Sequence, residues 1–190
     1  YENFDEWVTN FALNLPNIWN EESAKSLQPN SIERNKKSAI VIGRGPSIET
    51  YEHLKLLSES DYQGTIVCCD GKLSDALKAG VTPDKFPKFF VTTIDPYLEI
   101  KDHYDHEIID TYGSKIKGIF TIIVNPNAVE RARQSGIQIH WIHSLFDYNE
   151  GKKSFNNLSA MMIRAKNKHH GLPAIQTGGN VGTSSWFISW

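Results

Sequence analysis

The stretch that decides the fold of this chain is Ala39-Ile40-Val41-Ile42-Gly43-Arg44-Gly45-Pro46-Ser47-Ile48. A short apolar run ends in a Gly-x-Gly-Pro-Ser turn and a helical apolar pattern follows, which predicts a β-strand, a tight turn and an α-helix. In an open α/β sheet this first turn is where a phosphate group usually binds, because a helix N-terminus offers unpaired N–H groups and a partial positive charge. Gly43 and Gly45 let the backbone approach an anion with no Cβ in the way. The alternative is a tight turn that binds no ligand.

The details of the turn exclude two common nucleotide-binding motifs. Ile48 stands where a dinucleotide fingerprint has its third glycine, and Gly45-Pro46-Ser47 stands where a P-loop has Gly-Lys-Ser/Thr. Hydride transfer with a nicotinamide cofactor and a Walker-type NTPase are therefore both disfavoured. Because Pro46 fixes φ just before Ser47, we expect the Ser47 side chain to cap a helix that starts at Ile48.

The composition is that of a soluble globular protein and bounds its partners. The chain has 190 residues, of which 39% are hydrophobic and 22% charged, enough for one domain with a sizeable core, with or without an extension. The net charge of −2 provides no broad basic surface for nucleic acid, and we expect the basic cluster at residues 34–37 to be solvated.

No apolar run of about 18 residues and no signal peptide is visible, so we expect no membrane partner. The chain opens on Tyr1 and ends on an apolar stretch, so we expect it to be a piece of a longer protein.

The two cysteines, Cys68 and Cys69, are adjacent in an apolar run. On a strand they would point to opposite faces, so a disulfide between them would be strained and a two-cysteine metal site is implausible. They suit small core-filling residues in a reducing compartment, and we expect a cytoplasmic location.

Strand-like and helix-like segments alternate along the chain. Helical apolar spacing predicts a helix before Pro16, and a polar linking segment follows over residues 17–37. Strands are expected at 39–42, 65–69, 89–94, 119–124 and 137–142. Helices are expected between them and at 158–165, with stops at Gly80 and Gly136 and an N-cap and N1 proline at Asn125-Pro126. This alternation predicts an α/β fold, a Rossmann-like three-layer sandwich with a mostly parallel sheet over residues 38–190, preceded by an N-terminal helical extension over residues 1–37. We expect the domain to be incomplete at its C-terminal end.

Polar residues follow three of the predicted strands. The first strand ends at Gly43-Arg44-Gly45, the second at Asp70-Gly71 and the third at Asp95-Pro96. Because the carboxyl ends of parallel strands share one edge, we expect these groups to converge on one crevice. One carboxylate can accept ribose hydroxyls and the other can hold Mg²⁺, which prefers oxygen ligands. The alternative is that each aspartate only caps the turn that follows it.

Two further segments attract attention. A second glycine-rich turn, Gln176-Thr177-Gly178-Gly179-Asn180-Val181-Gly182-Thr183, leads into an apolar helical run, and it can either present a second set of N–H groups or let two elements pack closely. The segment Asp102-His103-Tyr104-Asp105-His106 holds four potential metal ligands. Its spacing matches no zinc pattern, so we expect a polar helix or loop there.

Four motifs, in this order, resemble a known family: Val41 to Ile48, Asp70-Gly71 with Leu77 to Asp84, Thr93 to Pro96, and Thr177 to Thr183. Over residues 39–190 the chain resembles the family of the archaeal 6-hydroxymethylpterin diphosphokinase MptE, which also includes the bacterial Maf motility accessory factors. The Gly-x-Gly-Pro-Ser turn is also similar to the nucleotide-sugar turn of some bacterial sialyltransferases.

The resemblance implies a Rossmann-like fold that binds a nucleotide. In the MptE branch, ATP and Mg²⁺ serve to transfer a diphosphate to the hydroxymethyl group of a reduced pterin, with release of AMP. In the Maf branch, the domain transfers a nonulosonic acid from a CMP-sugar to a flagellin hydroxyl. A nucleotide-binding domain without chemistry of its own is the third alternative. The compact length and the short N-terminal helix favour the pterin diphosphokinase.

Residue roles follow from that interpretation. The backbone of Gly43, Arg44, Gly45, Pro46 and Ser47 would hold phosphates, with Arg44 pairing with phosphate oxygens as a rigid fork. Asp95 is the candidate Mg²⁺ ligand, and Asp70, with Gly71, serves ribose or the metal. The second turn, Thr177 to Thr183, would close on the nucleotide or the acceptor. The acceptor is left open, with Asn125, Asp147, Asn156 and Asn157 available to bind a pterin edge, and a homo-oligomer is possible.

Overall fold

The computed structural model describes residues 3–28, 38–145, 147, 154–166, 171–176 and 180–189. Its centre is a sheet in the strand order β1-β6-β5-β4-β3-β2, with β7 paired to the end of β6. The strands are β1 (Glu22–Ser23), β2 (Ala39–Ile42), β3 (Thr65–Cys69), β4 (Phe89–Thr93), β5 (Lys117–Thr121), β6 (Gln138–Leu145) and β7 (Ala174–Gln176). Every pairing among them is parallel, so all their carboxyl ends lie at one edge of the sheet.

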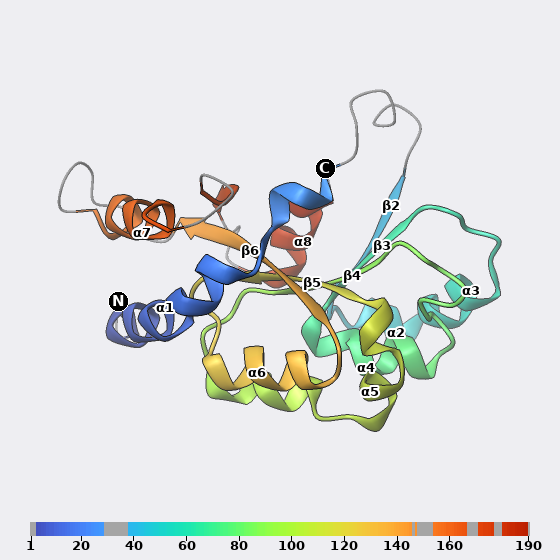
Figure 1. Ribbon diagram of the computed structural model, residues 1–190. Helices are drawn as coiled ribbons and strands as arrows, with labels where there is room; N and C mark the ends of the chain where they lie inside the picture. Colours follow the sequence, from blue (N-terminus) through green and yellow to red (C-terminus); the bar gives the residue numbers. More distant parts are fainter. Residues whose placement is uncertain are drawn as a thin grey trace.

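Helices cover both faces of the sheet and complete three layers (Figure 1). One face carries the connections between β2 and β6: α2 (Ser47–Thr50), α3 (His53–Glu59), α4 (Asp70–Lys78), η3 (Leu98–Tyr104), α5 (Glu107–Tyr112), η4 (Gly113–Lys115) and α6 (Pro126–Gln134). The opposite face carries α7 (Phe155–Arg164) and α8 (Val181–Ile188). Strands β2 to β6 are neighbours both in sequence and in space, and right-handed crossovers then place their helices on the same face. The predicted α/β three-layer fold is confirmed.

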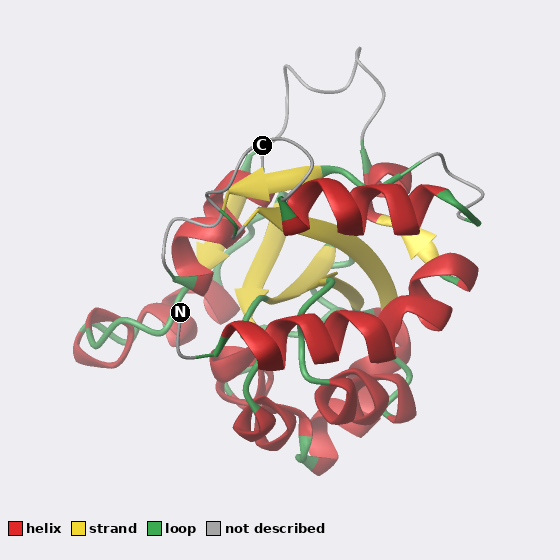
Figure 2. Ribbon diagram, turned by 90° about the vertical axis from the view of Figure 1, so that its left-hand side faces the viewer, coloured by secondary structure: helices red, strands yellow, loops and turns green. Residues whose placement is uncertain are grey.

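The N-terminal helix α1 (Phe4–Asn20) crosses the carboxyl edge of the sheet and packs against α6 and α7 (Figure 2). The helix runs through Pro16, where the sequence predicted its end, because Leu15 and Ile18 are buried on either side of the proline and hold the helix to the core. After α1 come β1, which pairs with β6, and η1 (Ala24–Leu27). The predicted boundary between extension and domain at residue 37 stays a prediction.

The core lies between the sheet and its two helical layers. Large side chains from distant parts of the chain are almost wholly buried in it, among them Phe11 of α1, Phe120 of β5 and Trp141 of β6. Each such side chain stabilises the fold by about 1.5–3 kcal/mol relative to leaving it exposed. Cys68 and Cys69 are free and fully buried on β3, and burial raises the pKa of Cys69 to about 11. The prediction that the cysteines fill the core is confirmed.

Several helix ends lie where local sequence motifs predicted them. Gly80 and Gly136 follow α4 and α6 with φ of +88° and +92°, a left-handed conformation that glycine adopts without strain. Asn125 accepts a hydrogen bond from the Asn127 amide at 3.0 Å, and Pro126 begins α6, as the N-cap and N1 proline predicted.

Two further predicted elements differ in the structure. The helix expected after the glycine turn is broken into α2 and α3, because Glu52 adopts φ of +50° between them. The strand expected at 119–124 ends at Thr121, and the buried residues Ile122, Ile123 and Val124 turn beneath α1 instead of extending the sheet. Among the helices of the described ranges, none is both long enough and apolar enough to cross a bilayer.

Candidate functional site

The predicted phosphate turn is an open turn at the carboxyl end of β2. Residues 44–47 are exposed, and α2, which starts at Ser47, is only four residues long. The prediction that Ser47 caps the helix is wrong, because Pro46 already has helical angles (φ −63°, ψ −22°) and takes the N-cap position. In the described part of the chain, the amides of Gly45 and Ser47 donate to no partner. They are available to an anion, although so short a helix adds little dipole of its own.

Arg44 reaches from this turn to the start of α4. A Cβ placed on Gly71 would lie 3.3 Å from Cδ and Nη1 of Arg44 and 3.2 Å from Cε1 of His103. Gly71 therefore occupies a narrow space between these two side chains. The ends of β2 and β3, which we expected to converge, are joined by the Arg44 side chain next to Gly71. The absence of a side chain at Gly71 leaves room for Arg44.

Asp70 is the first residue of α4 and its carboxylate is buried. Oδ1 accepts a hydrogen bond from the Gly71 amide at 2.6 Å and lies 3.6 Å from Nδ1 of His103, which is too long for a hydrogen bond. Oδ2 has no hydrogen-bond partner within the described residues. The alternative role as a turn cap thus accounts for one oxygen of Asp70 and leaves the other without a partner in the described part of the chain, which is costly for a buried polar atom.

Asp95 follows β4 and belongs to the same neighbourhood. Burial raises the pKa of Asp95 above its ordinary range, the negative charge of Asp70 raises it further, and His103 partly offsets the two. The structure therefore brings Arg44, Asp70 and Asp95 to one edge, as expected for the ends of three adjacent parallel strands.

The second glycine turn is only partly described. Thr177, Gly178 and Gly179 lie outside the described residues. Asn180 caps α8, accepting hydrogen bonds from the Thr183 amide at 2.9 Å and the Thr183 hydroxyl at 3.1 Å, and Val181, Gly182 and Thr183 form the first turn of that helix. The first turn of α8 follows β7, which is parallel to β6 and therefore ends at the carboxyl edge of the sheet.

Packing of α8 on the sheet is fixed by a buried hydroxyl pair, Ser185 with Thr92 of β4. Thr92 is in register with Cys69, the residue just before Asp70. Helix α8 lies on the face of the sheet opposite to α4, the helix whose Gly71 is next to Arg44 (Figure 1), and nothing in the described residues shows Asn180 or Gly182 in contact with the Arg44 side chain. The roles assigned to both turns stay predictions.

Sequence reasoning missed His103 as a member of the site. The sequence groups it with its neighbours as a possible metal cluster, yet His103 lies 3.6 Å from Asp70, Asp105 pairs with Arg131 and Tyr104 is buried against Thr93. No group of three or more potential metal ligands occurs within the described ranges. The short helix η3 turns His103 back toward Asp70, and no spacing in the sequence signals this.

Lys72 is a second residue that the sequence did not indicate. Its buried ammonium contacts Glu49 Oε1 at 2.7 Å and Asp75 Oδ2 at 2.8 Å. Because Glu49 lies on α2, this ion pair fastens the short helix, and with it the phosphate turn, to α4.

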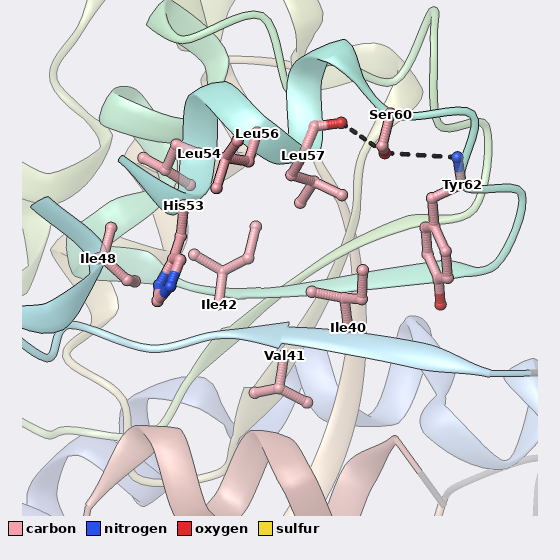
Figure 3. Close-up of a pocket in the computed structure, with 10 residues that line it drawn as sticks. All are labelled: Ile40, Val41, Ile42, Ile48, His53, Leu54, Leu56, Leu57, Ser60 and Tyr62. Atoms are coloured by element: carbon pink, nitrogen blue, oxygen red, sulfur yellow. Dashed lines mark hydrogen bonds between the residues drawn. The ribbon is translucent and has the colours of Figure 1, made fainter. Parts of the chain in front are cut away.

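An apolar groove of about 470 Å³ runs along β2, beneath α3 (Figure 3). Ile48 and His53 line it near the phosphate turn, and Tyr62 lines it at the far end. Neither Asp70 nor Asp95 lines this groove. We place the candidate site at the carboxylates, because they and Arg44 carry the chemistry that a nucleotide requires.

Of the four residues that the sequence offered for binding a pterin edge, Asp147 and Asn156 are hydrogen-bonded to each other next to Asn157, whereas Asn125 lies at the start of α6. Asn125 caps α6, and Asp147 accepts a hydrogen bond from the Phe155 amide at 2.5 Å before α7. Asn156 and Asn157 line a smaller cavity of about 160 Å³ beside His143. The structure does not bring these four residues together with Arg44 and Asp70.

The parallel sheet, its three layers and the polar carboxyl edge define an α/β protein of the Rossmann-like class. A family model described as 6-hydroxymethylpterin diphosphokinase MptE-like matches residues 9–189. The chain therefore belongs to the MptE-like family, and the match takes in α1 as well as the sheet. The family name implies a transferase-type enzyme. The searches of curated proteins and of solved structures gave no match.

Proposed function

We propose that this protein is an ATP- and Mg²⁺-dependent diphosphokinase that acts on the hydroxymethyl group of 6-hydroxymethyl-7,8-dihydropterin. Membership of the MptE-like family supports the reaction class. The observation that carries the assignment to a site is the convergence of Arg44, Asp70 and Asp95 at one edge of the sheet, with a buried carboxylate oxygen of Asp70 that has no hydrogen-bond partner among the described residues.

The two carboxylates fit a hard cation. Asp70 Oδ2 is buried without a hydrogen-bond partner in the described chain. Burial and the charge of Asp70 raise the pKa of Asp95, so its ionised form is disfavoured without a nearby positive charge. Mg²⁺ is commonly held by one or two carboxylates together with water and substrate phosphates, so fewer than three protein ligands suffice. Asp95 and Asp70 would hold the ion, which neutralises charge on the transferred phosphates when bound.

The protein itself contributes positioning and charge. In the proposed reaction the acceptor hydroxyl oxygen bonds to the β-phosphorus of ATP, the bond from that phosphorus to the α–β bridging oxygen breaks, AMP leaves and the hydroxyl proton is released to solvent. The amides of Gly45 and Ser47 would donate to phosphate oxygens, and the Arg44 guanidinium would pair with them as charge develops. Such positioning needs little covalent chemistry from the chain.

Calorimetry with ATP and with CMP, each with and without Mg²⁺, tests this function. We expect ATP to bind and to require Mg²⁺, and Asp95→Asn to weaken Mg²⁺-ATP binding by about tenfold or more. Asp102→Asn is the matched control, because it removes the same charge from an exposed position on η3 and should leave the affinity unchanged. Release of AMP with the hydroxymethyl pterin as acceptor then tests the reaction.

The outcomes separate the alternatives. A preference for CMP without a metal requirement would replace the proposal with a sugar transferase of the Maf kind. Failure to bind either nucleotide would refute a nucleotide site at this edge. If Asp95→Asn kept full Mg²⁺-dependent binding, the metal assignment would be wrong even with ATP as the substrate.

A further inference from the structure

The backbone on both sides of Asp95 is held by side chains from other elements. The Ile94 carbonyl accepts a hydrogen bond from the Thr121 hydroxyl of β5 at 2.9 Å. The Pro96 carbonyl accepts one from Nδ2 of Asn10, also at 2.9 Å. Both donor side chains are buried, so neither carbonyl has water as a ready substitute. The position of the Asp95 backbone is therefore set from outside its own loop.

Asn10 reaches this loop from α1, 86 residues earlier in the chain. Its amide also donates to the Ile123 carbonyl at 3.1 Å, so one side chain joins the loop after β4 to the segment after β5. The path of α1 across the carboxyl edge places Asn10 there (Figure 2). Only its Nδ2 among the α1 side chains described donates to the carbonyl next to Asp95.

Asn14 lies one helical turn later and provides a natural comparison. Its Nδ2 donates to the carbonyls of Ile122 at 3.3 Å and Val124 at 2.8 Å. Asn10 and Asn14 thus share a residue type, a helix face and the number of bonds, and both are buried. They differ in what they hold: Asn14 holds only the segment after β5, whereas Asn10 also holds the loop that carries Asp95.

We propose that Asn10 is a positioning residue of the nucleotide site, holding Asp95 beside Asp70 so that the two carboxylates can share a cation. The inference rests on the proposed function. The physical reason is that Asp95 is half-buried and that it and Asp70 directly follow the neighbouring parallel strands β4 and β3 at one edge of the sheet, where like charges in a partly dry site repel. A loop free to move would relieve that repulsion by carrying Asp95 into solvent. The bond from Asn10 opposes this movement before any cation binds.

The test compares Asn10→Ala with Asn14→Ala in the intact chain. Hydrogen exchange measured by mass spectrometry reports which loop opens, and calorimetry reports ATP affinity with Mg²⁺ and in EDTA. For Asn10→Ala we expect faster exchange over residues 94–98 and a Mg²⁺-ATP affinity lower by about ten- to hundredfold, as for other groups that orient metal ligands. For Asn14→Ala we expect faster exchange over residues 122–125 and an affinity within about twofold of wild type. The affinity measured in EDTA should not distinguish the two variants.

Thr121→Val extends the test if Asn10→Ala folds poorly. It keeps the shape of the side chain but frees the Ile94 carbonyl on the other side of Asp95, so it should reproduce the selective loss of Mg²⁺-ATP affinity. Equal losses of affinity in Asn10→Ala and Asn14→Ala, or unchanged exchange over 94–98 in Asn10→Ala, would overturn the positioning role. If the wild type binds no nucleotide while exchange over 94–98 still responds to Asn10→Ala alone, the proposed function fails and the loop anchor stands without a role in binding.

Discussion

Glu21 should be one of the residues on which folding stability depends most, although it lies within a segment that the sequence assigns to a linker. It follows α1 directly, and its carboxylate is shared between two distant elements. Oε1 accepts from Nε of Arg133 at 3.0 Å and from Nη2 at 2.6 Å, and Oε2 accepts from the Trp141 indole at 2.7 Å. Truncation to alanine therefore releases α6 and β6 from the end of α1 together.

The magnitude follows from what each partner loses. Trp141 is fully buried, and an indole N–H left without an acceptor there costs about 1–3 kcal/mol. Arg133 is partly exposed and keeps its bond to Glu130 at 2.7 Å, so its loss adds about 0.5–1 kcal/mol. We expect Glu21→Ala to lower the free energy of unfolding by about 1.5–4 kcal/mol, a large fraction of the total for a domain of this size. Glu21→Gln keeps one acceptor oxygen and should lose about half as much.

Urea denaturation followed by tryptophan fluorescence measures these differences, provided that the m-values agree. Glu59→Ala, at an exposed position of α3, is the control and should change stability by less than about 0.5 kcal/mol. In a Trp141→Phe background the indole donor is gone, so Glu21→Ala should then cost only about 1 kcal/mol. The reasoning is refuted if Glu21→Ala matches Glu59→Ala, or if its effect is the same in both backgrounds.

Three further predictions follow from single residues. Burial lowers the pKa of His143 to about 4, so between pH 6.5 and about 4 the unfolded chain binds a proton that the folded chain does not. The free energy of unfolding should therefore fall by up to about 3 kcal/mol as the pH drops through this window. Urea titrations at several pH values measure this dependence on pH, and His143→Gln should weaken it. Gly71→Ala should favour the helix by up to about 1 kcal/mol, but its Cβ should displace the Arg44 side chain. Thermal unfolding should therefore show no loss of stability, while calorimetry shows weaker ATP binding. An unchanged ATP affinity would contradict the proposed phosphate contact of Arg44. Gly113→Ala would place a Cβ 1.9 Å from the Ser135 carbonyl oxygen, and we expect a loss of about 1–3 kcal/mol in urea, with an unaltered midpoint counting against the packing described.

Features that depend on neighbouring residues along the chain could be predicted from the sequence. The glycines that end α4 and α6 and the Asn125-Pro126 start of α6 act within one helical turn, so their effects do not require distant partners. Alternation of apolar strands with helices also predicted the parallel sheet. That sheet in turn explains why Arg44, Asp70 and Asp95 could be predicted as a group, since each follows a strand directly and parallel strands end at one edge.

Other features were decided only by contacts between segments far apart in the sequence. The helix α1 continues through Pro16, and the apolar run at 122–124 turns away from the sheet to meet Asn14. In each case tertiary packing overrides a local preference that is worth only a few kcal/mol or less.

The sequence by itself thus determined the class of fold, the edge at which the polar residues gather and the three side chains that follow its strands. Only the tertiary structure placed His103 beside Asp70 and Asn10 beside Pro96. The physical reason is that periodicity describes which face of an element is buried, whereas a hydrogen bond between residues 86 positions apart depends on how α1 crosses the finished sheet.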